Sequence, residues 1–525
     1  MTSFLLALVL VSAVVLGGGT RSGFLGDVFV QALAVPLLIF SIYRLLFEPP
    51  VSQSPDSRSS GSQPQDGRAR VRRACWFLLS AALLVTVLQL LPLPAAVMGA
   101  LEDRVPIGVD NAAGRAIGSW HSITVSPHAT WSGFVSVLVP LAIFLAVAQI
   151  GEHSRIRLAQ LLIALGAISL VVGLLQVAQG PESQLRFFEV TNPSEAVGFF
   201  ANRNHFAALM YVTLVLAATW LISIKPDFTR RQLLATHYLV LLAAAFGLVV
   251  AIVAALAVAR SRAGILLTMI AMVGLVLLIR FSSRKPQGGS DEGGGVLRLI
   301  AVTLGFALLF AAQFGLHRVM TRLGVDPLED LRIPLTLTTL EEALRSFPFG
   351  TGIGSFVPVF AVVERPTELL ATYANRAHND FAEWLLELGI VAPLLFGIAL
   401  VWFISASVRV WRDRGHARQH LILQRAATLI VLLLLAHSLV DYPLRTTALM
   451  SVFAFASALL LPARHDPAHN GSGRQHRSDA GSEIGREARV PEAPRPLRPR
   501  ERWSGVEAWP EAWREPPASP GEKQQ

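Results

Sequence analysis

The stretch WSGFVSVLVPLAIFLAVAQI, residues 131–150, carries no charged side chain. A helix needs about 20 mostly apolar residues to cross the core of a bilayer, so this stretch predicts a transmembrane helix. About twelve stretches of the chain qualify in the same way. They begin near Thr2, Val28, Trp76, Trp131, Ile156, Phe199, Thr236, Gly264, Leu299, Phe381, Ala426 and Thr447. Because membrane β-barrels use short alternating strands, the sequence predicts an all-α polytopic membrane protein.

Composition leads to the same class. The 525-residue chain is 53% hydrophobic and only 15% charged, whereas soluble domains carry about 25% charged residues. These values exclude an ordinary soluble enzyme and imply contact with membrane lipids. The net charge of +9 indicates positive cytoplasmic loops and not a nucleic-acid partner. The single cysteine, Cys75, excludes an intrachain disulfide and a zinc site built from several cysteines.

The basic residues predict the orientation of the helices. Lysine and arginine concentrate in cytoplasmic loops, and counting helices forward from the linker 48–74 places every strongly basic short loop on one side. We therefore expect a membrane domain over residues 1–462, a flexible cytoplasmic linker at 48–74, a disordered cytoplasmic tail at 463–525, and both termini in the cytoplasm. The long segment 317–377 falls on the opposite side, and its length predicts a large, partly helical external loop.

Two arginine-bearing runs lie at the external ends of predicted helices. GFFANRNHFAALM places Arg203 and Asn204 at the mouth of one helix, and LAVARSRAGILL places Arg260 and Arg262 in a tight turn. Arginine binds phosphate through two parallel hydrogen bonds and stays charged. These residues therefore suit a pyrophosphate ligand. Interfacial anchoring, with the arginines at lipid headgroups, stays open as the alternative.

A third run, NRAHNDFAEWLLELGIVAPLLF, follows the long external loop. His378 is a candidate general base, because the pKa of an unperturbed histidine is about 6.5. Asn379 follows it, and we expect Asp380 to cap the next helix. A histidine that is merely hydrogen-bonded remains the alternative. We predict no metal site and no cofactor: the chain has no nucleotide-binding glycine loop, and the pair His416 and His420 lies in a basic segment expected to be solvated.

Several motifs resemble one known family in their order and spacing. They are FANRNHFA, SRAG at 261–264, the stretch from Arg332 to FPFGTGIGSF, AHND…LLELG at 377–389, and HSLVDYPL at 437–444. Together they are similar to the O-antigen ligase and O-antigen polymerase family, the integral-membrane glycosyltransferases called WaaL and Wzy. The shared region spans residues 241–406.

The resemblance implies a GT-C-like fold with about 12 transmembrane helices in a bacterial inner membrane and an active site that faces the periplasm. It implies metal-independent, inverting transfer of a glycan from an undecaprenyl-diphosphate carrier, in lipopolysaccharide or exopolysaccharide synthesis. The acceptor is a lipid A-core sugar for a ligase and another carrier-linked glycan for a polymerase. In this family His378 matches the residue proposed to activate the acceptor, and Arg203, Arg262 and Arg332 match positions proposed near the diphosphate.

A transporter or flippase for lipid-linked glycans, without transferase activity, is the alternative from another class. It predicts functional charges near the bilayer midplane and two pseudo-symmetric halves. Here the polar candidates collect on one face instead. A peptidoglycan polymerase and a protein O-glycosyltransferase are further possibilities within the enzyme class.

Overall fold

The computed structural model describes residues 2–21, 24–47, 63–94, 120–223, 236–282, 305, 332–364, 374–413 and 418–464. Most of the predicted linker, the apolar run predicted near Leu299, the first part of the long loop and nearly all of the predicted tail lie outside these residues. Residues 63–74, which the sequence assigns to the linker, form the first turns of a helix.

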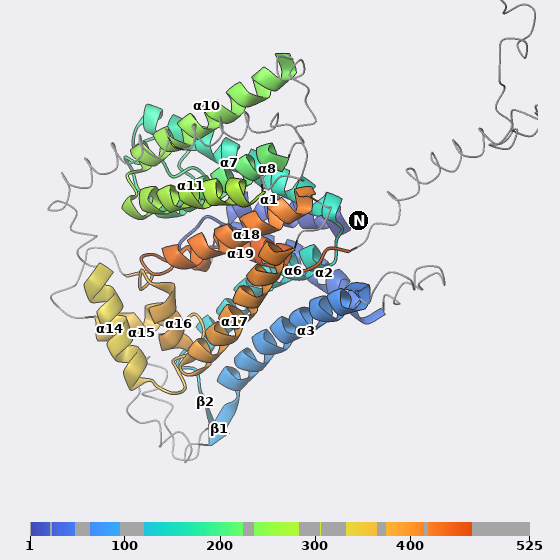
Figure 1. The fold of residues 1–525 in the computed structure, drawn as a ribbon. Coiled ribbons are helices and arrows are strands. Elements are labelled where there is room, and N and C mark those ends of the chain that lie inside the picture. The colour runs from blue at the N-terminus through green and yellow to red at the C-terminus, as the bar shows by residue number, and fades with distance from the viewer. Residues whose placement is uncertain are drawn as a thin grey trace, which may run out of the picture. The chain divides into compact units, whose positions relative to one another are not determined.

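The described chain is built almost entirely of helices (Figure 1). The N-terminal part comprises α1 (Thr2–Leu16), α2 (Leu25–Phe47), α3 (Gln63–Leu90), α6 (Pro127–Ala148), α7 (Glu152–Gln179), α8 (Arg203–Ser223), α10 (Thr236–Ala259) and α11 (Arg262–Ser282). The C-terminal part comprises α14 (Arg332–Arg345), α15 (Phe356–Val363), α16 (Asp380–Leu388), α17 (Val391–Arg412), α18 (Arg418–His437), the 3-10 turn η5 (Pro443–Arg445) and α19 (Thr447–Leu459). Strands β1 (Pro92–Pro94) and β2 (Trp120–Ser122) pair antiparallel, with Pro92 opposite Ser122.

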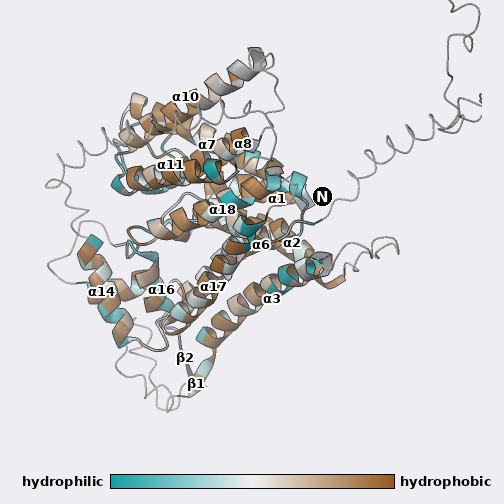
Figure 2. Cartoon of the chain, in the orientation of Figure 1, coloured by the Kyte–Doolittle hydropathy of each residue, from teal (hydrophilic) through white to brown (hydrophobic). Residues whose placement is uncertain are grey.

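Among the described residues, 8 helices are long and apolar enough to cross a membrane, and shorter apolar helices accompany them. Hydrophobic residues run along their whole length (Figure 2). Many of these side chains face outward, as Val401 of α17 does with 70% exposure. Water would not favour such a surface, whereas lipid solvates it. The protein is therefore a helical, multi-pass membrane protein, as predicted.

Helix α8 is central to the bundle. It packs against α7, α10, α11 and α18, and nearly all of its side chains are buried, including Phe206 and Tyr211. Helix α6 packs against α2, α3 and α19. The packing of these four helices around α8 fixes the position of the polar residues with which α8 begins.

The predicted span near Phe381 is two helices and not one. Helix α16 ends at Gly389, and α17 begins two residues later, at Val391. Gly389 has a φ of +57°, and a Cβ there would lie 2.1 Å from the carbonyl oxygen of Pro348. Only glycine fits this bend without strain. The run LLELG thus ends a short helix outside the spanning helix, which corrects the prediction of one continuous apolar helix.

We call the end of the bundle where Arg155 lies the basic end. Arg155, fully buried, donates hydrogen bonds to the carbonyl oxygens of Val147 and Leu461, at 3.1 and 2.7 Å. Gln419 donates to the carbonyl of Ser223 at 3.2 Å. These bonds bring the ends of α6, α8 and α19 together with the starts of α7 and α18. His420 is buried there too, which corrects its expected place on a solvated surface.

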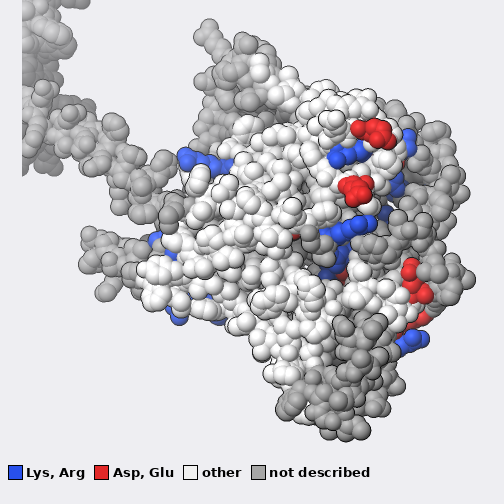
Figure 3. Space-filling model, turned by 180° about the vertical axis from the view of Figure 1, so that it is seen from behind, with Lys and Arg blue, Asp and Glu red and all other residues white. Residues whose placement is uncertain are grey.

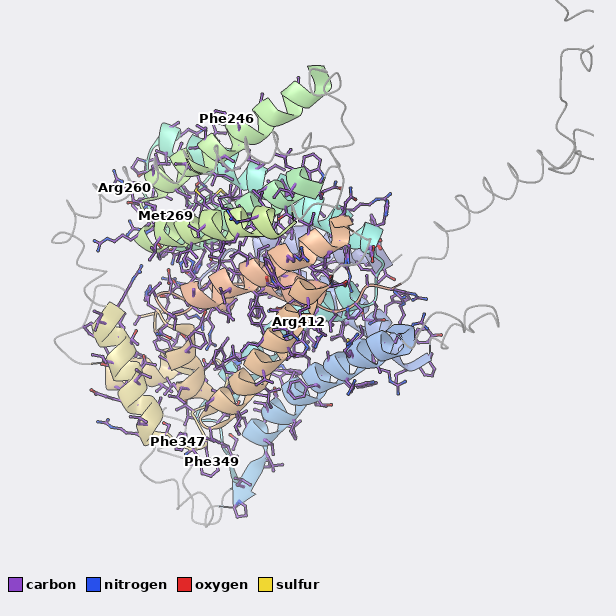
Figure 4. All side chains as sticks on the ribbon, in the orientation of Figure 1. Phe246, Arg260, Met269, Phe347, Phe349 and Arg412 are labelled. Carbon is purple, nitrogen blue, oxygen red and sulfur yellow. The ribbon has the colours of Figure 1, made fainter. Side chains whose placement is uncertain are left out.

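The other end, which we call the loop end, holds the opposite helix termini. The backbone N–H of Ala448 donates to the carbonyl of Gly17, and Asn375 donates to the carbonyl of Thr20 at 3.5 Å. Figure 4 shows Arg260 at this end of the helices and Arg412 away from it. Among the described residues, Arg155 and Arg412 therefore lie away from the end that holds Arg260.

Candidate functional site

The core of the site is a hydrogen-bonded pair, His378 and Asp441. Nδ1 of His378 lies 3.2 Å from Oδ1 of Asp441, across 63 positions of sequence. The Asp441 side chain is fully buried, while that of His378 keeps 21% exposure. Because an ionised carboxylate only accepts hydrogen bonds, Nδ1 carries a hydrogen, and in the neutral ring Nε2 therefore keeps its lone pair. This is the form of histidine that accepts a proton.

Asp441 is held ionised by its surroundings. Burial raises the pKa of its carboxyl, but the hydrogen bond from His378 and the charge of Arg332 together hold that pKa well below its usual range. The amide nitrogen of Asn204 donates to Oδ2 at 2.5 Å, and the backbone N–H of Tyr442 donates to Oδ1 at 3.0 Å. Asp441 therefore presents a fixed negative charge to the histidine.

Asn204 connects this pair to the turn between α10 and α11. The hydroxyl of Ser261 donates to Oδ1 of Asn204 at 2.7 Å, and the backbone N–H of Gly264 donates to the same hydroxyl at 3.0 Å. The Asn204 amide therefore has a fixed orientation, with its NH2 toward Asp441. Residues from FANRNHFA, SRAG, AHND and HSLVDYPL, which are far apart in sequence, meet in one hydrogen-bonded chain.

Tyr442 packs between two histidines. Its ring meets those of His205 and His378 edge-on, with centroids 4.8 and 4.9 Å apart. The amides of Asn202 and Asn375 both donate to its hydroxyl oxygen at 3.4 Å. Burial raises the pKa of Tyr442 to about 12, so its phenol stays protonated. The Tyr442 ring thus restricts the His378 ring in addition to the hydrogen bond with Asp441.

The structure places the predicted arginines at the loop end, and two of them share one carboxylate. Arg203 lies 3.2 Å and Arg260 lies 3.6 Å from Oε1 of Glu195. Arg332 donates to the carbonyl oxygen of Val440, the residue before Asp441, at 3.4 Å. Arg262 begins α11 directly after the bonded Ser261. Figure 3 shows basic and acidic side chains close together on one side of a largely uncharged face.

Behind His378, helix α16 carries three fully buried carboxylates on one face. Arg445 lies between them, 3.6 Å from Asp380, 3.5 Å from Glu383 and 2.7 Å from Glu387. Arg376 pairs with Glu383 at 2.8 Å. Burial raises the pKa of Asp380 to about 7 and also raises that of Glu387. The pKa of Glu383 is lowered, since its two arginines outweigh the effect of burial.

The helix cap differs from the prediction. Asn379 caps α16, accepting from the backbone N–H groups of Phe381 and Ala382 at 3.0 and 3.1 Å. Asp380 is the first helical residue and instead accepts from the hydroxyl of Ser438 at 2.7 Å. A carboxylate at this position also faces the positive end of the helix dipole. Asp380 thus ties α16 to α18 and does not reach toward the exposed side of His378.

Sequence reasoning assigned no role to Asp441, Tyr442 or Glu195. HSLVDYPL was recognised as a motif, and its aspartate was the available signal for a histidine partner. Glu195 had no signal, because an isolated acidic residue in a loop is usually solvated. Within the described ranges, no group of three or more His, Cys, Asp or Glu residues has an arrangement that could hold a metal ion.

Comparison with known protein families finds one match. A family model described as O-antigen ligase matches residues 247–397. This region includes Arg260, Arg262, Arg332 and His378, and ends before Asp441. No curated protein matches the chain.

Proposed function

From the match of residues 247–397 to the O-antigen ligase family model, we propose that the chain transfers a glycan from an undecaprenyl-diphosphate carrier to an acceptor sugar. In this proposal the reaction takes place at the periplasmic face of an inner membrane, where the loop end lies. The protein acts as an O-antigen ligase or as a polymerase of surface polysaccharide.

The observation that carries this proposal is the His378–Asp441 pair at the loop end. Nε2 of His378 accepts the proton of an acceptor hydroxyl while the hydroxyl oxygen attacks the anomeric carbon of the donor sugar. The bond from that carbon to the carrier diphosphate breaks, and attack from the opposite side inverts the configuration. The buried carboxylate of Asp441 stabilises the imidazolium that forms.

The arginines supply the charge that the leaving diphosphate needs. Arg203, Arg262 and Arg332 stand on three different elements around the pair, and fixed positive groups stabilise a developing anion more than mobile water does. Glu195 holds Arg203 and Arg260 near each other before the donor binds. A diphosphate would replace one carboxylate as their partner, so the arginines need little rearrangement.

The arrangement of polar groups favours an enzyme over a transporter. Among the residues that the structure describes, His378 and its arginines lie at helix starts and turns of the loop end, and not along the middle of the spanning helices. Alternating access requires binding residues near the midplane.

Glycan profiling of a strain that lacks the gene tests the proposal, with the strain carrying the wild-type gene as control. Loss of all polymer on lipid A-core with accumulation of carrier-linked polymer identifies a ligase. Single repeat units left on the core identify a polymerase. An unchanged profile of all surface glycans would contradict both forms of the proposal.

A further inference from the structure

Helix α14 exposes a row of large apolar side chains, which water would not favour. Ile333, Leu337 and Leu344 are 69%, 54% and 69% exposed. With about 100° between successive residues, they lie within one narrow stripe. We call this set, extended by Phe347 and Phe349 just beyond the helix, the α14 stripe. Phe347 and Phe349 are 46% and 44% exposed.

The buried face of α14 is mixed in polarity. Leu335 and Ala343 join a small apolar cluster. Thr338, Thr339 and Glu342 also point inward, and Ser346 directly after the helix is buried too. This face packs on α16, and Thr336 donates to the carbonyl of Ala377 at 3.1 Å. The exposed apolar side chains thus lie outside the face that packs on α16, and such an apolar stripe is typical of a helix that lies in the membrane interface.

The stripe is continuous with the surface of a membrane-spanning helix. The backbone N–H of Ile390 donates to the carbonyl of Pro348 at 2.8 Å, which joins the corner Phe347–Phe349 to the start of α17. Only 6% of the apolar window of α17 is buried, and Leu394 in its first turn is 59% exposed. Figure 4 shows Phe347 and Phe349 next to each other at the foot of α14.

From this continuity we propose that α14 is an interfacial helix, with the α14 stripe seated in the acyl region of the same membrane that α17 crosses. The corner at Phe347–Phe349 sets its depth, because it is hydrogen-bonded to the end of a spanning helix. Arg345, 66% exposed, stands about 100° around the helix from Leu344 and reaches the headgroups. At the other end of α14, Arg332 bonds to the residue before Asp441. The helix thereby connects the membrane surface to the candidate site.

Spin labels attached to single cysteines test this proposal in the full-length protein in lipid nanodiscs. Cys75 is replaced by alanine, and Leu344→Cys is compared with Arg345→Cys, a neighbour of similar exposure on a different face. Both sites are at the surface, and unchanged thermal unfolding shows that each labelled variant is folded. The measured quantities are collision of the label with oxygen, which dissolves in lipid, and with a water-soluble nickel complex.

The compared quantity is the ratio of oxygen collisions to nickel collisions at each label. We expect this ratio to be at least about threefold higher for the Leu344→Cys label than for the Arg345→Cys label. Equal ratios at the two positions, with ready access of nickel to both, would show that the stripe faces water and would overturn the proposal. Protection of the Leu344→Cys label from both reagents would also overturn it, because it would show that protein covers the stripe. Neither result depends on glycan transfer, so the proposed function is tested separately.

Discussion

Replacement of Asp441 by asparagine exchanges one carboxylate oxygen for an NH2 group and removes the negative charge. Asp441 accepts from Asn204 at one oxygen and from His378 and Tyr442 at the other. Asparagine keeps only one accepting oxygen. Since Ser261 fixes the orientation of the Asn204 amide, an asparagine NH2 on that side meets the Asn204 NH2, donor against donor.

The reverse orientation harms the histidine. An asparagine NH2 facing Nδ1 of His378 makes that nitrogen an acceptor, so the ring hydrogen moves to Nε2 and the lone pair needed for the base is lost. A general base contributes about 10²- to 10⁴-fold to a rate. We therefore expect the Asp441→Asn variant to lose about 10²- to 10⁴-fold in kcat, or about 3–5 kcal/mol of transition-state stabilisation.

The assay is transfer by the purified protein in nanodiscs, supplied with carrier-linked donor and acceptor. Glu341→Gln, which alters an exposed carboxylate on α14, is the control and should keep the wild-type rate. If Asp441 acts through His378, the variant that carries both Asp441→Asn and His378→Ala transfers glycan no more slowly than the variant with His378→Ala alone. A wild-type rate for Asp441→Asn, or independent losses that multiply in the double variant, would refute the reasoning.

Further predictions concern the buried charges and the arginines. Arg445→Met leaves buried carboxylates unpaired and should destabilise the fold by about 3–5 kcal/mol. Arg412→Met changes an exposed arginine at the end of α17 and should cost less than about 1 kcal/mol; equal shifts in thermal unfolding would contradict this. The folded protein holds the proton of Asp380 more tightly than the unfolded chain, since its pKa rises from 3.8 to about 7. Ionised Asp380 therefore destabilises the fold increasingly as pH rises through this window, and Asp380→Asn should gain Tm relative to wild type between about pH 4 and pH 7; a constant difference would exclude this. Arg203→Ala should raise the KM for the donor about 10- to 100-fold, which is the effect expected from loss of a charged hydrogen bond. Arg260 is more exposed, so Arg260→Ala should raise the KM far less. Equal increases in KM, measured by steady-state kinetics, would contradict the assigned roles.

The spanning helices could be predicted from the sequence because a bilayer requires long apolar runs, and each run identifies itself without tertiary information. The break at Gly389 could not. It results from the approach of the Pro348 carbonyl, which belongs to a different segment. The apolar run continues across the break, so hydropathy alone extends the helix through it.

The residue types of the site were predictable, but their pairing was not. His378, Arg203 and Arg332 stood out as polar residues at the external ends of apolar runs. The partner of His378 is 63 positions away, and the partner of Arg203 is a glutamate in an irregular loop. Such pairs depend on how the helices pack, which periodicity does not encode. The same limit explains the assignment of the cap to Asp380, since Asn379 competes for it at the adjacent position.

The central claim is that His378 removes the proton of the acceptor hydroxyl. Its most direct test is the transfer rate of His378→Ala in nanodiscs at saturating carrier-linked donor, with binding of the donor measured in the same preparation. The mechanism predicts a loss of at least about 100-fold in transfer with donor binding retained, because the arginines remain in place. Transfer at the wild-type rate by a folded His378→Ala protein would contradict it.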